Sequence, residues 1–303
     1  MGWEYEGLFE RDLAEEELDA PLAYAYWRSL PTAVKFGEMG YRTRTIRAGD
    51  RLEAEVYPIF GREDRGRLRA AKGNISRAAQ KKLNNERSIR HLIRLVDANF
   101  GENDSHVALT YAGELPDPER VRKDIRNFLL RVRRAWERKA AEAAVFGRAW
   151  PELKYIYAVG GDEMPARGWS GKRPHIHLIM TGGLPAEDLI RIWRKGRVRC
   201  DVLQPNEEGL EGLARYFTKQ RFDRPPKSGA RMWAGSRNLK QPKVRTSDTK
   251  CSNARVRRIA MDFRNEAKEV MEKVYPGYRF VKCSVYHSDV VRGVYIRAVM
   301  RRL

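Results

Sequence analysis

Cysteine is scarce in this sequence, with only Cys200, Cys251 and Cys283 among 303 residues. The three are far apart and form neither a CxxC pair nor a disulfide framework, so we expect a reducing, cytoplasmic setting. Long apolar runs are also missing. No stretch of about 18 apolar residues occurs, so we expect neither a membrane-spanning helix nor a membrane partner. The first twenty residues lack a basic start and an apolar centre, so we expect no signal peptide.

Acidic residues are outnumbered, since 60 Lys and Arg against 40 Asp and Glu give a net charge of +20. The first twenty residues hold eight acids and one arginine, a net charge of −7, which leaves +27 on residues 21–303. A field of that sign attracts polyanions, and nucleic acid is the commonest one. The plain alternative is a basic surface that only keeps the chain dissolved.

Hydrophobic periodicity predicts an α+β fold. Residues 41–60 alternate apolar and polar side chains around Gly49 and Asp50, which predicts a β-hairpin. Helical spacing follows over residues 74–100. Farther on, strands are predicted at residues 105–113, 153–160, 174–180 and 197–204, and helices at residues 117–144, 185–196 and 206–220. This order favours an antiparallel sheet flanked by helices over the regular alternation of a doubly wound fold.

The C-terminal part has a different composition. Residues 221–250 are rich in Pro, Gly, Ser and basic residues and are expected to be extended or loop-like. Residues 253–275 read as one helix, and residues 278–300 as a second hairpin. We therefore divide the chain into three parts. They are an acidic arm, hairpin and basic helix (1–100), a central domain (101–222), and a basic loop, helix and hairpin (223–303).

The stretch RPHIHLIM, residues 173–180, contains two of the five histidines. In a strand, His175 and His177 share one face, and the residues between and after them make the other face apolar. Two imidazoles on one strand face can hold one divalent metal with ligands from elsewhere. A structural zinc site would need more Cys or His nearby. Two histidines and a carboxylate instead suit Mg²⁺ or Mn²⁺. Strand histidines without a ligand role are the plain alternative.

The stretch GLARYFTK, residues 212–219, reads as an amphipathic helix. Leu213, Ala214 and Phe217 fall on its apolar stripe, whereas Tyr216 and Lys219 lie three apart on another face. Gly212 on that second face would let a backbone approach closely. A tyrosine hydroxyl pointing away from the core can act as a nucleophile, and a lysine one turn on can offset negative charge. Alternatively, the tyrosine only edges the core.

Four stretches, in this order, resemble the HUH-superfamily rolling-circle replication initiators, in particular the Rep proteins of Gram-positive bacterial plasmids, phages and integrative elements. They are HVALTY (106–111), RPHIHLIM (173–180), GLARYFTKQ (212–220) and RMWAGSRNLKQP (231–242). The resemblance covers roughly residues 70–245. It implies an HUH-type central antiparallel sheet of about five strands, with N- and C-terminal additions and the endonuclease domain at residues 101–222.

The resemblance also implies roles for individual residues. His175 and His177 match the metal ligands, and Tyr216 matches the nucleophile that takes the 5′ phosphate and frees a 3′ hydroxyl. Lys219 matches the lysine that positions or neutralises. The implied activity is a metal-dependent, site-specific single-strand DNA endonuclease and ligase that starts rolling-circle replication through a covalent 5′-phosphotyrosine. Only one tyrosine lies in the motif, so a single-tyrosine enzyme is implied.

The third metal ligand departs from the family pattern. The family often places an acid at the end of the strand before the histidine strand, but Gly160 stands there in this chain. Glu163, with Asp162 as the alternative, is the acid expected to substitute.

Further residues are expected to bind DNA. Basic and aromatic side chains after the tyrosine helix would pair with phosphates and stack on bases, although Trp233 could instead tack a loop to the domain. His106 shares a strand face with Thr110, so both lie near the metal or are ordinary sheet residues. The expected DNA-binding set is Thr110, Arg173, Arg215, Arg231, Trp233, Arg237 and Lys240.

The implied partners are single-stranded or cruciform origin DNA, a host helicase and a polymerase. Two other functions stay open. An HUH transposase or relaxase would use the same chemistry, and a non-catalytic single-stranded-DNA-binding protein would use the basic surface alone. A covalent protein–DNA adduct in Mn²⁺ separates the enzymes from the binding protein.

Overall fold

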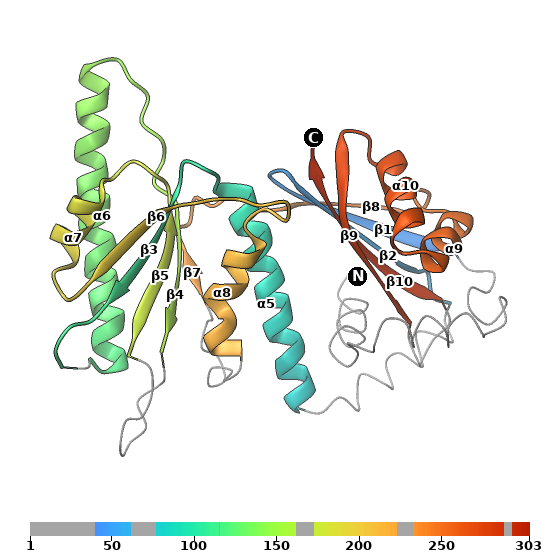
Figure 1. Cartoon of the computed structure of the whole chain (residues 1–303), viewed down its shortest axis with the longest axis horizontal. Coiled ribbons are helices and arrows are strands. Elements are labelled where there is room, and N and C mark those ends of the chain that lie inside the picture. The colour runs from blue at the N-terminus through green and yellow to red at the C-terminus, as the bar shows by residue number, and fades with distance from the viewer. Residues whose placement is uncertain (1–39, 62–76, 115, 162–172, 223–232, 288–292) are drawn as a thin grey trace. The chain divides into compact units, whose positions relative to one another are not determined.

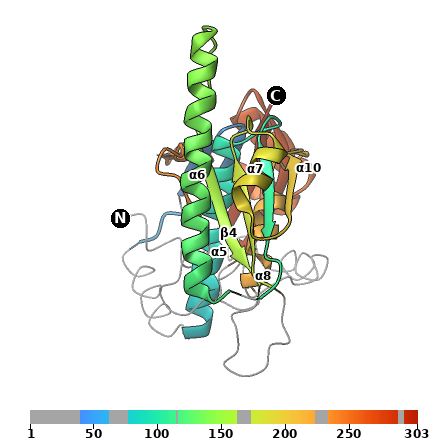
Figure 2. The ribbon, with the colours of Figure 1, turned by 90° about the vertical axis from the view of Figure 1, so that its left-hand side faces the viewer.

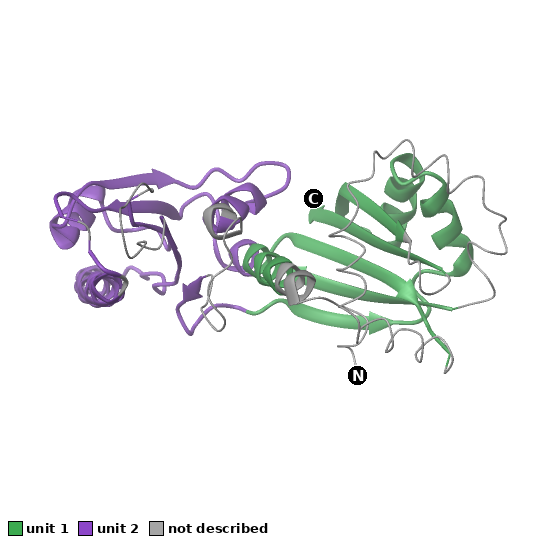
Figure 3. Ribbon diagram, turned by 90° about the horizontal axis from the view of Figure 1, so that it is seen from below, with its two compact units in different colours: residues 1–94, 241–303 green, residues 95–240 purple. Residues whose placement is uncertain are grey.

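Two five-stranded antiparallel sheets organise the chain, so the predicted α+β class is confirmed. The computed structural model describes residues 40–61, 77–114, 116–161, 173–222, 233–287 and 293–303 (Figure 1). The chain divides into two units, each built on one sheet. Unit 1 contains residues 1–94 and 241–303, and unit 2 contains residues 95–240 (Figure 3).

The sheet of unit 2 has the strand order β6-β3-β5-β4-β7. Its strands are β3 (Ser105–Thr110), β4 (Tyr155–Gly160), β5 (His175–Met180), β6 (Val198–Val202) and β7 (Ala234–Gly235). The first four lie where the alternation of the sequence predicts strands. The short β7 lies in a segment that we expected to be loop-like. It pairs with β4 at Ile156 and Tyr157, so β4 has a hydrogen-bonded neighbour on the side away from β5.

Helices cover both faces of this sheet. The helices α6 (Pro118–Val145) and α7 (Ala186–Trp193) pack on one face, and α8 (Glu211–Phe222) lies on the other (Figure 1). The helix α6 runs unbroken over its whole length (Figure 2). Asp117 caps it, because its Oδ1 accepts the Arg120 amide at 2.7 Å and Pro118 occupies the first turn.

The end of α7 differs from the expectation. The sequence predicts a helix over residues 185–196, and a left-handed residue is common just past a helix end. The helix instead ends at Trp193, and Arg194 takes the left-handed conformation with φ of 53°. Gly196 has a different structural role, since a Cβ there would lie 2.3 Å from the Thr110 carbonyl oxygen. A glycine is needed because the backbone passes against the end of β3.

Unit 1 contains the other sheet, in the order β8-β1-β2-β10-β9. Its strands are β1 (Tyr41–Ala48), β2 (Arg51–Pro58), β8 (Lys243–Ser247), β9 (Tyr278–His287) and β10 (Val294–Arg302). The predicted N-terminal hairpin is confirmed, and Gly49 at φ of 60° opens its two-residue turn. The helix α5 (Arg77–Asn99) begins in unit 1, and its residues from 95 onward belong to unit 2.

The two hairpins of unit 1 join side by side, because β2 pairs with β10 from Arg51↔Arg301 to Val56↔Ile296. One face of the joined sheet is apolar and packs against α9 (Asn253–Met261) and α10 (Asn265–Val274). Our sequence division set residues 1–100 and 223–303 apart as separate additions. In the structure the beginning and the end of the described chain share one sheet.

The single helix expected over residues 253–275 is wrong, since it is broken into α9 and α10. Asp262 lies at the break, where its Oδ1 accepts the amides of both Arg264 and Asn265 at 2.9 Å. These local bonds end one helix and start the next, because they offer the backbone an alternative to the helical ladder. Among the described helices, none is long and apolar enough to cross a membrane.

Candidate functional site: a histidine face under a tyrosine helix

The strand β5 separates its side chains as the alternation predicts. Ile176, Leu178 and Met180 are at most 1% exposed and pack against α6 and α7. His175 and His177 lie on the opposite face, with their ring centroids 4.9 Å apart and nearly perpendicular. Because β5 is the middle strand, flanked by β3 and β4, both imidazoles stand at the centre of the sheet.

A third imidazole completes this face. The Nε2 atom of His106, on β3, lies 3.2 Å from Nδ1 of His177, and the two rings stack at 5.4 Å. The sequence left open whether His106 lies near the pair, and the register of β3 against β5 decides it. We call His106, His175 and His177 the histidine face.

The surroundings of His177 keep its imidazole neutral. Burial, with the neighbouring His175 and His106, lowers the pKa of His177 to about 4. Burial also lowers the pKa of His106. A neutral imidazole has a free lone pair on one ring nitrogen, which is the form that binds a metal. His177 is therefore in the form that binds a metal at neutral pH.

Backbone and side-chain contacts orient these rings. Nδ1 of His175 lies 2.9 Å from the Arg173 carbonyl oxygen, so Nδ1–H donates to that oxygen and Nε2 is the ring nitrogen outside this bond. His106 gives His177 a comparable partner at Nδ1. Metal-binding histidines are commonly held in this way, with the second ring nitrogen engaged by a carbonyl or another acceptor. His175 and His177, whose ring centroids are 4.9 Å apart, are the two side chains of this face that could hold a divalent metal.

The helix α8 brings an aromatic pair onto the histidine face. Phe217 is 2% exposed, and its ring lies 5.5 Å from His106 and 5.4 Å from His177. Tyr216, the preceding residue, is 51% exposed, and its ring lies 5.1 Å from His177 in an edge-on arrangement. Phe217 thus anchors the helix while Tyr216 keeps one side in solvent beside the imidazoles.

Two contacts fix the start of α8. The Leu210 amide donates to Oδ1 of Asp97 at 3.1 Å, and Glu211 is buried and accepts from Arg215 at 2.9 Å. Leu210 and Ala214 are buried on the stripe that leads to Phe217. Gly212 lies on the exposed side, where a Cβ would meet nothing within 4 Å. The close backbone approach that we expected there has no counterpart in the described residues.

The structure describes only some of the other residues that were predicted as metal ligands or catalytic groups. Glu163 and Asp162 lie outside the described residues. Lys219 belongs to α8, three positions after Tyr216, but its side chain is not among those described. Gly160 pairs with His175 across β4 and β5, so glycine indeed occupies the place where an acid was expected. Within the described ranges, no group of three or more His, Cys, Asp or Glu side chains is arranged to hold a metal.

One acid on the histidine face escaped the sequence analysis. Asp201, on β6, pairs with His106 in the register of β3 against β6, so both side chains point to the same side. Its Oδ2 accepts from Arg199 at 2.8 Å. The only signal for it in the sequence is the alternation of residues 197–204, and its strand partner cannot be read from that.

The predicted DNA-binding residues fall into two groups. Thr110, Arg173 and Arg215 belong to the strands and the helix that carry the histidine face and Tyr216, or lie next to them. Arg173 donates to the carbonyl oxygens of Tyr111 and Gly113. Arg215 pairs with Glu211. Thr110 lies opposite His175 in the register. Arg237 and Lys240 are exposed and Trp233 is half-buried, all after α8. Arg231 lies outside the described residues.

Comparison with known proteins identified no relative of this chain. No protein-family model, curated protein or solved structure matches the chain.

Proposed function

We propose that this chain is a metal-dependent HUH-type endonuclease that nicks and rejoins single-stranded DNA and initiates rolling-circle replication in the cytoplasm. One observation carries the proposal: the ring of Tyr216 lies 5.1 Å from that of His177, at the edge of the histidine face. The resemblance of the four motifs predicts this proximity. His177 and Tyr216 are 39 residues apart in the sequence, so chain connectivity alone does not bring them together. A tyrosine beside two ligand-competent imidazoles is the arrangement that the proposed chemistry needs.

In the proposed reaction His175 and His177 would hold a Mg²⁺ or Mn²⁺ ion, whose contribution is to make the scissile phosphorus more electrophilic. Glu163 or Asp162 would add the carboxylate. The Oη atom of Tyr216 attacks phosphorus in line, loses its proton and forms an O–P bond. The bond between phosphorus and the 3′ oxygen breaks, and that oxygen ends as a 3′ hydroxyl. The 5′ phosphate remains on Tyr216, and the reverse reaction joins the strand again.

Lys219 has a supporting part in this proposal. A free phenol has a pKa near 10, so its anion needs stabilisation at neutral pH. A lysine three positions later on the same helical face supplies positive charge for the phenolate or the phosphate. The basic residues around α8 would hold the strand, and origin DNA, a host helicase and a polymerase would be the partners.

The test is a covalent adduct. The chain is incubated with Mn²⁺ and a pool of 3′-labelled single-stranded oligonucleotides of randomised sequence, then run on a denaturing gel. Labelled protein is expected for the parent chain and for Tyr278→Phe, a matched control in unit 1. None is expected for Tyr216→Phe, which removes one oxygen and should keep the fold. If Tyr216→Phe still forms the adduct, another residue is the nucleophile. If the parent chain forms no adduct, the alternative of a non-catalytic DNA-binding protein is favoured.

A further inference from the structure

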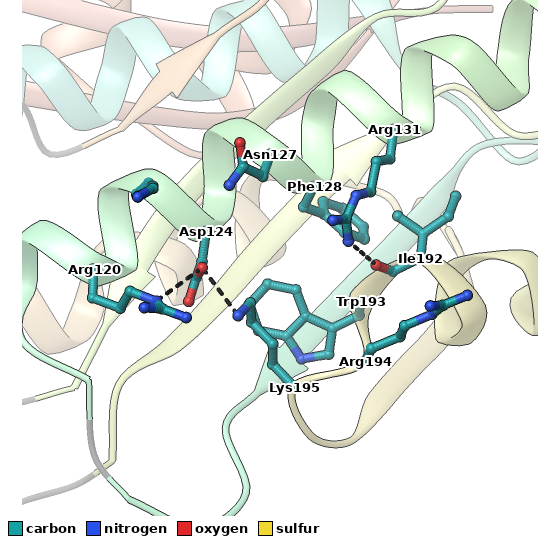
Figure 4. Close-up of a pocket in the computed structure, with 10 residues that line it drawn as sticks. Arg120, Asp124, Asn127, Phe128, Arg131, Ile192, Trp193, Arg194 and Lys195 are labelled. Carbon is teal, nitrogen blue, oxygen red and sulfur yellow. Dashed lines mark hydrogen bonds and ion pairs between the residues drawn. The ribbon is translucent and has the colours of Figure 1, made fainter.

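A basic pocket lies on the other side of the unit 2 sheet from the histidine face. It has a volume of about 280 Å³ and opens between α6 and the end of α7 (Figure 4). Its charged lining side chains are Arg120, Lys123, Asp124, Arg131, Arg194 and Lys195. Since α6 and α7 cover the apolar face of the sheet, the whole sheet separates this pocket from His177 and Tyr216.

The single acid of the pocket is already neutralised. Asp124 is 4% exposed, and its Oδ1 lies 3.1 Å from Nζ of Lys195 and 3.4 Å from Nε of Arg120 (Figure 4). Among the described residues, the other three cations of the pocket have no carboxylate partner. Arg131 and Arg194 donate there to the carbonyl oxygens of Ile192 and Arg191, at 3.4 and 2.7 Å.

Lys123 has no ion-pair partner in the described part of the chain. The pocket therefore carries a surplus of positive charge that an external anion can balance.

The backbone at Arg194 is unusual in a way that favours a functional interpretation. Among the described residues it is the one non-glycine with positive φ, and it closes α7 at the place where glycine fits with least strain. An arginine in a left-handed conformation points to a use for its side chain, because such strain concentrates at binding sites. Arg194 is among the residues that line the pocket, and its Nε donates to the Arg191 carbonyl oxygen (Figure 4).

The positive charge continues along α6 beyond the pocket. Arg134 and Arg138 follow Arg131 at intervals of three and four residues, and Lys123 precedes Asn127 by four. All of these residues are exposed and share one helical face. We call this row, Arg120, Lys123, Asn127, Arg131, Arg134 and Arg138, the α6 stripe. At about 1.5 Å per residue it extends for about 27 Å along a rigid helix.

The composition of the stripe identifies its ligand. We infer that the α6 stripe and Arg194 bind the phosphate backbone of duplex DNA. A single-stranded site normally adds exposed aromatic rings for base stacking. The aromatic residues of the pocket, Phe128 and Trp193, are 3% and 1% exposed and offer no such platform. Contacts through charge alone suit a duplex, whose bases are stacked inside and whose phosphates repeat about every 3.4 Å along each strand.

This site is separate from the proposed nuclease. The sheet lies between the two, so a duplex on the α6 stripe would leave the histidine face open to a single strand. Unit 2 would then hold two DNA segments at once, a duplex on its helical side and the strand to be cut on the other. The inference depends on the charge of α6 and α7 and not on the chemistry of Tyr216.

Matched triple variants test it. The first is Lys123→Ala, Arg131→Ala and Arg134→Ala in the stripe. The control is Arg122→Ala, Arg126→Ala and Arg133→Ala, which removes the same charge from exposed positions on another flank of the same helix. Binding to a fluorescent 20-base-pair duplex of random sequence, and to its single strand, is measured from about 50 to 200 mM salt. A third variant, Arg194→Gly, removes the side chain at a position where glycine is conformationally favoured.

The stripe triple should lower duplex affinity at least tenfold and reduce the slope of log affinity against log salt by about 2 to 3, since each lost phosphate contact removes about 0.9. The control triple should change the slope by less than about 1, and single-strand affinity should hold. Arg194→Gly should weaken duplex binding at unchanged melting temperature. Equal losses in both triples, equal losses on single strands, or no duplex binding by the parent chain would overturn the inference. If the parent chain forms no covalent adduct while the stripe triple alone loses duplex affinity, the inference stands and the proposed function falls.

Discussion

The two sheets share a plan but use their second faces differently. Each has an apolar face under two helices and a polar face on the other side. In unit 1 the polar side of β2 and β10 carries arginines and glutamates that form ion pairs with one another. Glu53 is 1% exposed and lies 2.6 Å from Arg51, 2.7 Å from Arg94 and 3.2 Å from Arg297. In unit 2 the polar side carries three imidazoles beside a half-exposed tyrosine.

The difference separates a polar face that holds the fold together from one that keeps binding capacity. Burial alone would raise the pKa of Glu53, but the charges of Arg297, Arg94 and Arg51 hold that pKa well below its usual value. Its carboxylate oxygens are therefore fully engaged within unit 1. His177 is buried without a carboxylate partner of that kind among the described residues, and its lowered pKa leaves a ring nitrogen for a ligand.

The largest expected effect is on the histidine face. His177→Ala removes a proposed ligand, and His175→Ala the other, so adduct formation in Mn²⁺ should fall by more than the 10- to 100-fold typical of outer-shell changes. The fold should survive, because β5 packs through its opposite face. His91→Ala in α5 is the control, expected to cut at the parent rate. Parent-level cutting by the double histidine variant would show that the two imidazoles hold no catalytic metal.

The corresponding change in unit 1 should act on stability. Glu53→Gln leaves three arginines beside a neutral amide, and removing one partner of a buried charge cluster costs about 3–5 kcal/mol. The measurement is urea unfolding at pH 7, with Glu102→Gln, an exposed acid of unit 2, as control. A loss below about 1 kcal/mol would mean that the cluster does not stabilise unit 1 and that the two polar faces differ less than their structures indicate.

The smallest effect is a pH dependence of that same stabilisation. The pKa of Glu53 is lowered in the folded chain from an ordinary value of 4.5. As the pH falls below 4.5 the unfolded chain binds the proton first, so the contribution of Glu53 is complete above 4.5 and is lost toward its folded pKa. The stability difference between the parent chain and Glu53→Gln should therefore be constant from pH 7 to about 5.5 and shrink at pH 3.5. An unchanged difference at pH 3.5 would assign the effect to packing instead of charge.

Local patterns in the sequence were sufficient to predict most strands and helices of unit 2. The alternation around His175 and the helical spacing around Tyr216 predicted which face each side chain takes, because both follow from backbone geometry over a few residues. That the two faces meet was a demand of the resemblance. His106 and Asp201 could not be placed with the same certainty, because their neighbours depend on strand register between segments 70 to 95 residues apart.

In unit 1 the pairing of distant strands could not be predicted from local sequence patterns. Both hairpins were predicted, but the pairing of β2 with β10 joins residues 240 or more positions apart, and no local pattern specifies it. The break at Asp262 was missed for a different reason: the apolar spacing continues across it, while two side-chain hydrogen bonds override the helix.

The pairing of β2 with β10 also has a consequence for the order of folding during synthesis. Unit 2 is one continuous segment, and its ends meet where Asn99 exchanges two hydrogen bonds with the backbone of Lys240, at 2.8 and 2.9 Å. It can fold on the ribosome once residue 240 has emerged. Unit 1 must wait for residues 294–302, so β2 meanwhile has an unpaired edge. The part proposed to cut DNA would therefore be complete while the rest of the chain is still being made.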